Sequence, residues 1–278
     1  MPTVVHSSPA LTFNDGRATP QLGLGALMPA EITAGVVRAA LETGYRLIDT
    51  AASYRNEAAV GEGIRLSGVP RDEIFITTKL RSDDQGYDEA LRAFDASLKR
   101  LGTDYVDLYL IHWPAPARGR YIDAWRALTR LCEEGQARSI GVSNFMIEHL
   151  RRIVAETGVT PALNQIELHP QFQQSELRAF HAGQGIVTQA WSPLGRGKLL
   201  KHAEVARVGA RHGKTPAQAI LRWHLDRGLS AIPKSVRVER LEENFEVFDF
   251  RLDDEDMAAM TRLDDPNGRM GPDPLSWT

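Results

Sequence analysis

Four ionisable residues stand at or just after the ends of three apolar, strand-like segments of this 278-residue chain. They are Asp49 and Tyr54 with segment 46–51, Lys79 at the end of 74–79, and His112 at the end of 106–112. In a parallel β/α barrel such strand ends converge on one face, which carries the catalytic groups. A carboxylate, a phenol, an amine and an imidazole brought together there are suited to proton transfer.

Taken singly, each of the four has an ordinary structural explanation, such as a helix cap, a packing aromatic or a lysine that reaches solvent. Taken together, they predict reduction of a carbonyl. An ammonium at Lys79 lowers the pKa of the Tyr54 phenol from about 10 towards the working range. Asp49 pairs with Lys79 and makes its burial tolerable. Neutral His112 hydrogen-bonds the carbonyl oxygen while Tyr54 gives the proton, and a cofactor must supply the hydride.

The elements that must position these residues follow an alternation of strand-length apolar segments and amphipathic helical segments. The predicted strands are 22–27, 46–51, 74–79, 106–112, 137–142, 162–167, 186–191 and 229–234. Eight such units predict an α/β fold, a (β/α)8 TIM barrel of one domain over residues 1–278. A turn at 14–16 adds an N-terminal β-hairpin, and the helical segments 205–211, 216–227 and 253–262 include extra helices.

A doubly wound dinucleotide-binding sheet is the rival α/β architecture. Its G-x-G-x-x-G fingerprint fails here, because Gly23-Leu24-Gly25 is followed by Ala26-Leu27-Met28 and the third glycine is missing. Any dinucleotide must therefore bind in another way.

The composition excludes several classes of partner. A net charge of −3 gives no general attraction for nucleic acid or an anionic membrane. No segment approaches the roughly 20 apolar residues of a membrane span, and the first residues lack a signal-peptide pattern. The single cysteine, Cys132, fits a helix-packing role in a reducing cytoplasm. These features together predict a cytoplasmic protein. The histidines show no metal-ligand spacing, so we expect no metal.

Several motifs, in order along nearly the whole chain, resemble the signatures of the aldo-keto reductases. They are Asp49-Thr50-Ala51-Ala52-Ser53-Tyr54, Lys79, Ile111-His112-Trp113-Pro114, segment 140–145 and Ile232-Pro233-Lys234-Ser235. Segment 191–198 is similar to the prokaryotic branch that includes 2,5-diketo-D-gluconic acid reductases. The resemblance implies an NADPH-dependent, metal-free, monomeric reductase on a (β/α)8 barrel.

Further strand-end residues are candidates for the cofactor site. Trp191 offers a flat face for nicotinamide stacking, and Ser143, Asn144 and Gln165 offer donors and acceptors for its carboxamide. The family pattern implies Lys234, Ser235, Val236 and Arg240 near the 2′-phosphate, Asn244 on adenine, and Ser192, Leu194 and Arg196 along the pyrophosphate. Two cations and a hydroxyl around a phosphate favour NADPH over NADH.

The substrate is expected to be a small carbonyl compound. Leu27, Trp113 and Trp277 are candidates for its apolar pocket, and the short loops around it predict broad acceptance. Two alternatives stay open at this point. A Schiff-base lyase or aldolase would use Lys79 as nucleophile, and a non-enzymatic subunit would only sense the cofactor.

Overall fold

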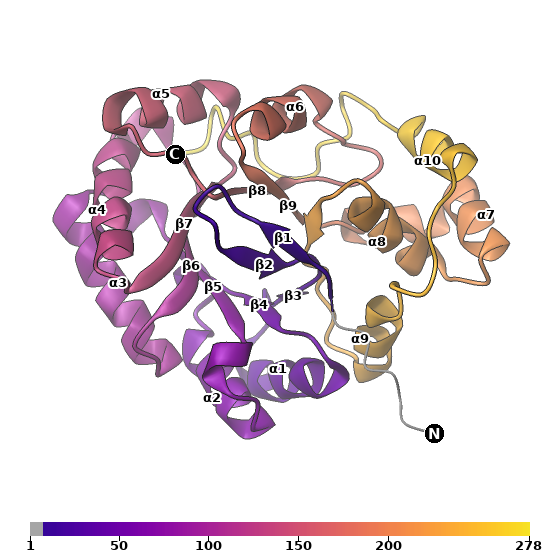
Figure 1. The fold of residues 1–278 in the computed structure, drawn as a ribbon, viewed down its shortest axis with the longest axis horizontal. Helices are drawn as coiled ribbons and strands as arrows, with labels where there is room; N and C mark the ends of the chain where they lie inside the picture. The colour runs from indigo at the N-terminus through magenta and orange to yellow at the C-terminus, as the bar shows by residue number, and fades with distance from the viewer. Residues whose placement is uncertain (1–7) are drawn as a thin grey trace.

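The computed structural model describes residues 8–278, and their central element is an eight-stranded sheet enclosed by helices (Figure 1). The strands are β3 (Leu24–Gly25), β4 (Leu47–Asp49), β5 (Phe75–Leu80), β6 (Val106–Ile111), β7 (Ala137–Ser143), β8 (Leu163–Glu167), β9 (Val187–Trp191) and β10 (Ser230–Ala231). Neighbouring strands pair in parallel and in chain order. Leu22 also bridges to Ala231, and the Gly25 amide donates to the Pro233 carbonyl at 3.1 Å. These bonds join the first strand to the last, so the predicted (β/α)8 barrel is confirmed.

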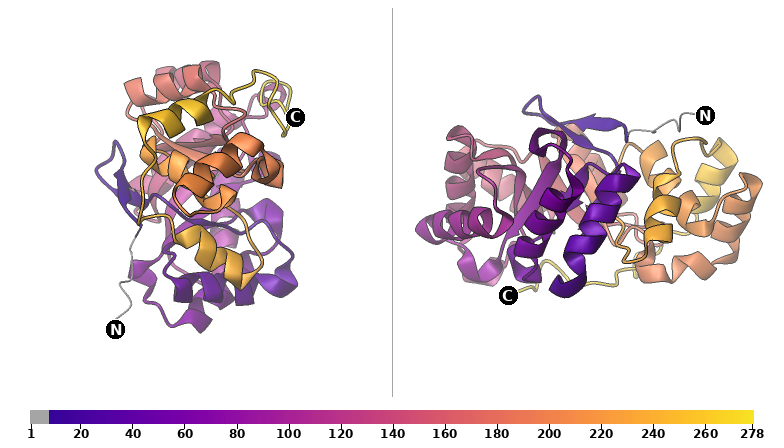
Figure 2. Two further views of the ribbon diagram at one scale, coloured as in Figure 1. Left: turned by 90° about the vertical axis from the view of Figure 1, so that its right-hand side faces the viewer. Right: turned by 90° about the horizontal axis from the view of Figure 1, so that it is seen from below.

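Helices cover the outside of this sheet, as the two further views show (Figure 2). They are α1 (Ala30–Thr43), α2 (Glu57–Ser67), α3 (Tyr87–Leu101), α4 (Tyr121–Glu133), α5 (Ile147–Thr157), α6 (Ser175–Gly183), α7 (Ala203–Arg211), α8 (Pro216–Asp226), α9 (Val238–Phe245) and α10 (Asp254–Thr261). Both α7 and α8 precede β10, so the prediction of an extra helix there is confirmed. None of the described helices is long and apolar enough to cross a bilayer.

The side chains of the buried strands alternate between the inside of the barrel and the surrounding helices. Along β6, Leu108 and Leu110 pack inside with Phe13 and Leu163, whereas Tyr109 belongs to the outer core beneath the helices. Phe13 follows the first strand of the N-terminal hairpin, in which β1 (Ala10–Thr12) pairs antiparallel with β2 (Ala18–Pro20). The hairpin and the C-terminal tail lie on opposite faces (Figure 2). One end of the barrel is thus closed by apolar packing, which leaves the other for polar groups.

Three predicted strands are shorter in the structure: segments 22–27 and 229–234 have only two strand residues each, in β3 and β10, and segment 46–51 has three, in β4. Pro233 has no N–H and cannot continue a ladder. The segment before Pro233 is still bonded to both neighbouring strands. The Ile232 amide donates to the Ala190 carbonyl in β9, and the Gly23 amide, next to β3, donates to the Ala231 carbonyl. Residues 1–7, which bear on the signal-peptide expectation, lie outside the described residues.

Candidate active site

Asp49 and Lys79 form a buried ion pair between adjacent strands. Asp49 ends β4, and Lys79 lies near the end of β5; both side chains are almost fully enclosed. Lys79 Nζ lies 2.5 Å from Asp49 Oδ1 and donates to the Thr50 carbonyl at 2.9 Å. Gln165 Nε2 donates to the other carboxylate oxygen, Oδ2, at 2.7 Å. Each group of the pair is paired with the opposite charge and also makes a further hydrogen bond, so the pair is stable when buried away from water.

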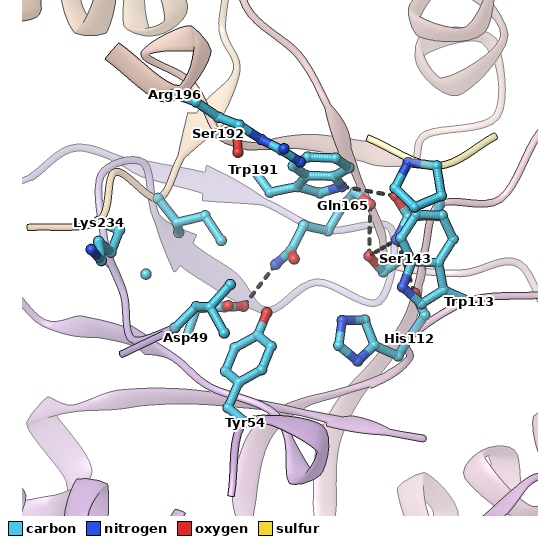
Figure 3. A pocket seen from close by; sticks show the side chains of 15 residues that line it. Asp49, Tyr54, His112, Trp113, Ser143, Gln165, Trp191, Ser192, Arg196 and Lys234 are labelled. Carbon is cyan, nitrogen blue, oxygen red and sulfur yellow. Dashed lines mark hydrogen bonds between the residues drawn. The ribbon is translucent and has the colours of Figure 1, made fainter. Parts of the chain in front are cut away.

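Tyr54 and His112 face the same space beside Asp49 (Figure 3). Their rings meet edge to face with centroids 5.7 Å apart, and Lys79 Nζ lies 5.1 Å from the Tyr54 ring centroid. Ser53 Oγ lies 3.2 Å from His112 Nδ1. The three strand ends therefore bring the four sequence-predicted residues into one cluster.

The loop that carries Tyr54 is held by a buried asparagine that the sequence argument missed. Asn56 donates to the carbonyls of Ala26 at 2.6 Å and Met28 at 3.2 Å, and it accepts a bond from Thr50. These bonds tie the turn after β4 to the turn after β3. They fix the short 3₁₀ turn Ala52–Tyr54, from whose end the phenol projects.

Burial sets the direction of the pKa shifts of Tyr54 and His112. It raises the pKa of Tyr54, and Asp49 adds to this increase, while Lys79 opposes it without reversing it. The expectation that Lys79 brings this pKa below its ordinary value is therefore wrong, since desolvation outweighs the ammonium. Burial and the charge of Lys79 lower the pKa of His112 to about 3. Burial works to lower the pKa of Lys79, but Asp49 and Tyr54 raise it above its ordinary value.

A pocket of about 290 Å³ opens beside these groups. Many predicted site residues line it: Asp49, Tyr54, His112, Ser143, Asn144, Gln165, Trp191, Ser192, Arg196, Lys234, Leu27 and Trp113. The lining thus changes from acid–base groups through amides and an indole to two cations. Lys234 lies across the view from Trp113 (Figure 3).

Other predicted residues do not line this pocket. They are Lys79, Leu194, Ser235, Val236, Arg240, Asn244 and Trp277. Lys79 stands behind Asp49, and Ser235 and Val236 connect β10 to α9, which carries Arg240 and Asn244. Trp277 stacks on Trp113 at a centroid distance of 4.7 Å and lines a neighbouring hollow, so it backs the pocket wall.

The amides beside Trp191 form a connected network. The indole N–H donates to Asn144 Oδ1 at 2.8 Å, and Asn144 Nδ2 donates to the His112 carbonyl at 3.0 Å. Gln165 Nε2 donates to both Asp49 and Gln189, at 2.7 Å each. Both N–H groups of Gln165 are thus engaged, whereas no donor in residues 8–278 bonds its side-chain oxygen, which can accept a bond from a ligand. Gln165 thus connects the acid–base cluster to the indole side of the pocket.

The cations on the other side lack acidic partners. Among residues 8–278, no carboxylate lies within 4.0 Å of the charged groups of Arg196, Lys234 or Arg240. Free cations next to a flat aromatic face and neutral amides suit a molecule with an amide-bearing ring at one end and phosphates at the other. This donor set fits a nicotinamide dinucleotide phosphate.

Some site residues escaped the sequence argument because their signals were weak. Pro272 lines the pocket from a tail without secondary structure, and Glu167 is a carboxylate at the end of β8. Its strand-end position is the same signal that singled out Asp49 and Lys79. Within the described part of the chain, no group of three or more His, Cys, Asp or Glu residues is placed to hold a metal ion.

The fold and this site define a barrel oxidoreductase, and comparison with known proteins gives the family. The model of the aldo/keto reductase family matches residues 19–265, and the chain belongs to that family. It is 54% identical over 271 residues to an aldo-keto reductase of Mycolicibacterium smegmatis, covering 97% of this chain and 98% of the relative. It is 52% identical over 269 residues to the methylglyoxal reductase DkgA of Yersinia pestis, covering 96% of each chain.

A solved structure of a Gox0644 mutant in complex with NADPH superposes with a TM-score of 0.95. It is 48% identical, with 98% of this chain and 100% of that chain covered. The DkgA relative agrees with the resemblance to the 2,5-diketo-D-gluconic acid reductase branch. The chain is thus an NADPH-dependent oxidoreductase that reduces carbonyl groups.

Proposed function

We propose that Tyr54 is the proton donor in this reduction, supported by Lys79 and Asp49, with His112 orienting the substrate carbonyl. The observation that carries the proposal is that Tyr54, His112 and Asp49 line one pocket, with Lys79 buried behind them and paired with Asp49. NADPH, when bound, would supply the hydride for the carbonyl carbon. The side chains supply the proton and bind the oxygen.

The protonation states suit these roles. Tyr54 keeps its proton at neutral pH because its pKa is raised. His112 is neutral, and if Nδ1 accepts from the Ser53 hydroxyl, Nε2 carries the proton and donates to the substrate oxygen. As the phenol gives up its proton, the adjacent Lys79 ammonium stabilises the phenolate that forms. Asp49 keeps Lys79 protonated and holds it at 2.5 Å.

The same pocket residues are proposed to hold the cofactor. Trp191 would stack on the nicotinamide ring, while Ser143, Asn144 and Gln165 bind its carboxamide. The pyrophosphate would contact Ser192, Leu194 and Arg196, and the adenosine end would contact Lys234, Ser235, Val236, Arg240 and Asn244. The support for this assignment is that, within residues 8–278, no carboxylate pairs with Arg196, Lys234 or Arg240 and no donor bonds the side-chain oxygen of Gln165.

We also propose the substrate pocket, the class of reaction and the state of the protein in the cell. Leu27, Trp113 and Trp277 would surround a small carbonyl substrate, and the exposure of Leu27, 60%, supports an open, permissive pocket. The reaction would be of the alcohol dehydrogenase (NADP⁺) type, acting on CH–OH donors in reverse. We further propose that residues 1–278 act as one domain and as a cytoplasmic monomer without nucleic-acid or membrane partners, consistent with the net charge of −3.

Tyr54→Phe tests the assignment of the proton donor. The variant should still bind NADPH, which is measured by the quenching of tryptophan fluorescence. It should reduce a panel of aldehydes about 10²–10⁴-fold more slowly, as measured by NADPH absorbance, because this is the usual contribution of a general acid. Tyr105→Phe is the matched control, since that ring packs under Arg71 at 4.0 Å, outside the pocket lining. Turnover within tenfold of the wild type in Tyr54→Phe would overturn the assignment.

A further inference from the structure

Glu167 is a buried carboxylate that the proposed proton transfer does not use. It ends β8 with 1% of its surface exposed. Its Oε1 accepts from the Met270 amide at 2.7 Å, and its Oε2 accepts from the Gly271 amide at 2.9 Å. His169 Nε2 lies 3.3 Å from Oε1. Two consecutive backbone N–H groups, more than a hundred residues away in sequence, therefore converge on one carboxylate.

The segment held by Glu167 lies against the pocket. A Cβ added at Gly271 would come within 2.5 Å of the Trp191 indole and 2.9 Å of Glu167 Oε2, so only glycine fits between them. The following residue, Pro272, lines the pocket. The contact thus runs from the Glu167 carboxylate through the tail backbone to the Trp191 indole ring and the pocket wall.

Other contacts keep the start of the tail in place without Glu167. The Asp265 amide donates to the Gln171 carbonyl at 3.2 Å, and Gly268 packs so close to the same carbonyl that a Cβ would lie 1.9 Å from it. Loss of the Glu167 bonds would therefore free the backbone at Met270 and Gly271, while α10 and the barrel remain folded and Trp277 stays stacked on Trp113.

We propose that Glu167 is a positioning residue that anchors the tail at Met270 and Gly271 and thereby sets the substrate side of the pocket. The proposal rests on the proposed function of this pocket. Because Glu167 touches none of Tyr54, Lys79 and His112, it acts on substrate binding through the tail and leaves proton transfer to that cluster.

Glu167→Gln tests the proposal. One side-chain oxygen is replaced by an NH₂ group, which faces an amide N–H, so only one of the two bonds survives. We expect the KM for an aromatic aldehyde to rise about tenfold, equivalent to about 1.4 kcal/mol. The kcat and the Kd for NADPH should stay within about threefold of the wild type. Hydrogen exchange in the peptide 269–278 should become faster.

Gly271→Ala provides a second route to the same state, because its methyl group would clash with the Trp191 indole and with Glu167 Oε2 and would push the tail away from a carboxylate that keeps its charge. It should raise the KM similarly, and the double variant should add little to either single change. Leu275→Ala is the matched control, since this tail residue is 48% exposed and lies outside the pocket lining. It should leave the KM and the exchange rate unchanged.

Two results would overturn the inference: unchanged KM and exchange in both variants, or a fall in kcat or Tm without a rise in KM. If Glu167→Gln fails to fold, Gly271→Ala decides by the same measurements. A wild type that reduces no aldehyde in the panel would instead contradict the proposed function. The exchange experiment would then still report whether Glu167 anchors the tail.

Discussion

Replacing Asp49 with asparagine removes the charge that holds Lys79 in the barrel. The two groups are buried at 1% and 0% exposure, with Nζ and Oδ1 2.5 Å apart. The new amide cannot satisfy its neighbours, because Lys79 donates to one carboxylate oxygen and Gln165 to the other. In either orientation the asparagine NH₂ faces a donor. An uncompensated buried charge of this kind costs about 3–5 kcal/mol.

This cost predicts both a stability loss and an activity loss. With an unfolding entropy of about 2.1 cal/mol/K per residue, the 278-residue chain should lose roughly 5–9 °C in Tm. Without Asp49, burial lowers the pKa of Lys79, so the ammonium loses its proton more readily. The phenolate of Tyr54 is then no longer stabilised, and kcat should fall at least about 100-fold, within the usual range for general acid catalysis.

Urea unfolding and NADPH oxidation measure the two effects of Asp49→Asn. Glu156→Gln is a matched control, because it breaks only exposed ion pairs, with Arg152 at 2.9 Å and Arg126 at 3.7 Å, and should cost at most about 1 kcal/mol. The double variant Asp49→Asn/Lys79→Met should lose about 2 kcal/mol less free energy of unfolding than the two single variants lose together. The reasoning fails if Asp49→Asn unfolds within about 1 kcal/mol of the wild type, or keeps more than about a tenth of its kcat.

Three further predictions follow from other parts of the molecule. Arg240→Ala should weaken NADPH binding about tenfold and leave NADH binding unchanged, because only NADPH carries the 2′-phosphate; equal losses in fluorescence titrations would contradict this. The pKa of His112 is about 3 and that of Tyr54 is raised, so neither group should change its protonation between about pH 6 and 9. The kcat/KM for reduction should therefore be constant over this range, and a fall within it would contradict the assigned protonation states. Burial lowers the pKa of His181 to about 4 and of His224 to about 3, so the unfolded state binds more protons below the ordinary value of 6.5. Stability in urea should therefore fall by about 2 kcal/mol per histidine between pH 7 and pH 5, and an unchanged midpoint would refute it.

Much of the fold could be predicted from the sequence because its signals are local. Apolar strand-length segments alternate with amphipathic segments that stop at glycines such as Gly68, Gly102 and Gly158, each of which has a positive φ. The strand ends then follow from the barrel topology, which is why Asp49 and Lys79 could be assigned to one face. The ends of β3 and β10 were less predictable, because their pairing depends on barrel closure around Pro233.

The site could be predicted only as a set of residues. The sequence by itself determined which ionisable groups and which aromatic face meet at the strand ends, because side-chain type and strand order are written in it. Only the tertiary structure decided that Tyr54 has a raised pKa, that Lys79 stands behind the pocket, and that Glu167 holds the tail. Desolvation depends on every element packed around a group, and the Glu167 contact joins backbone amides a hundred residues away, so neither can be inferred from local sequence.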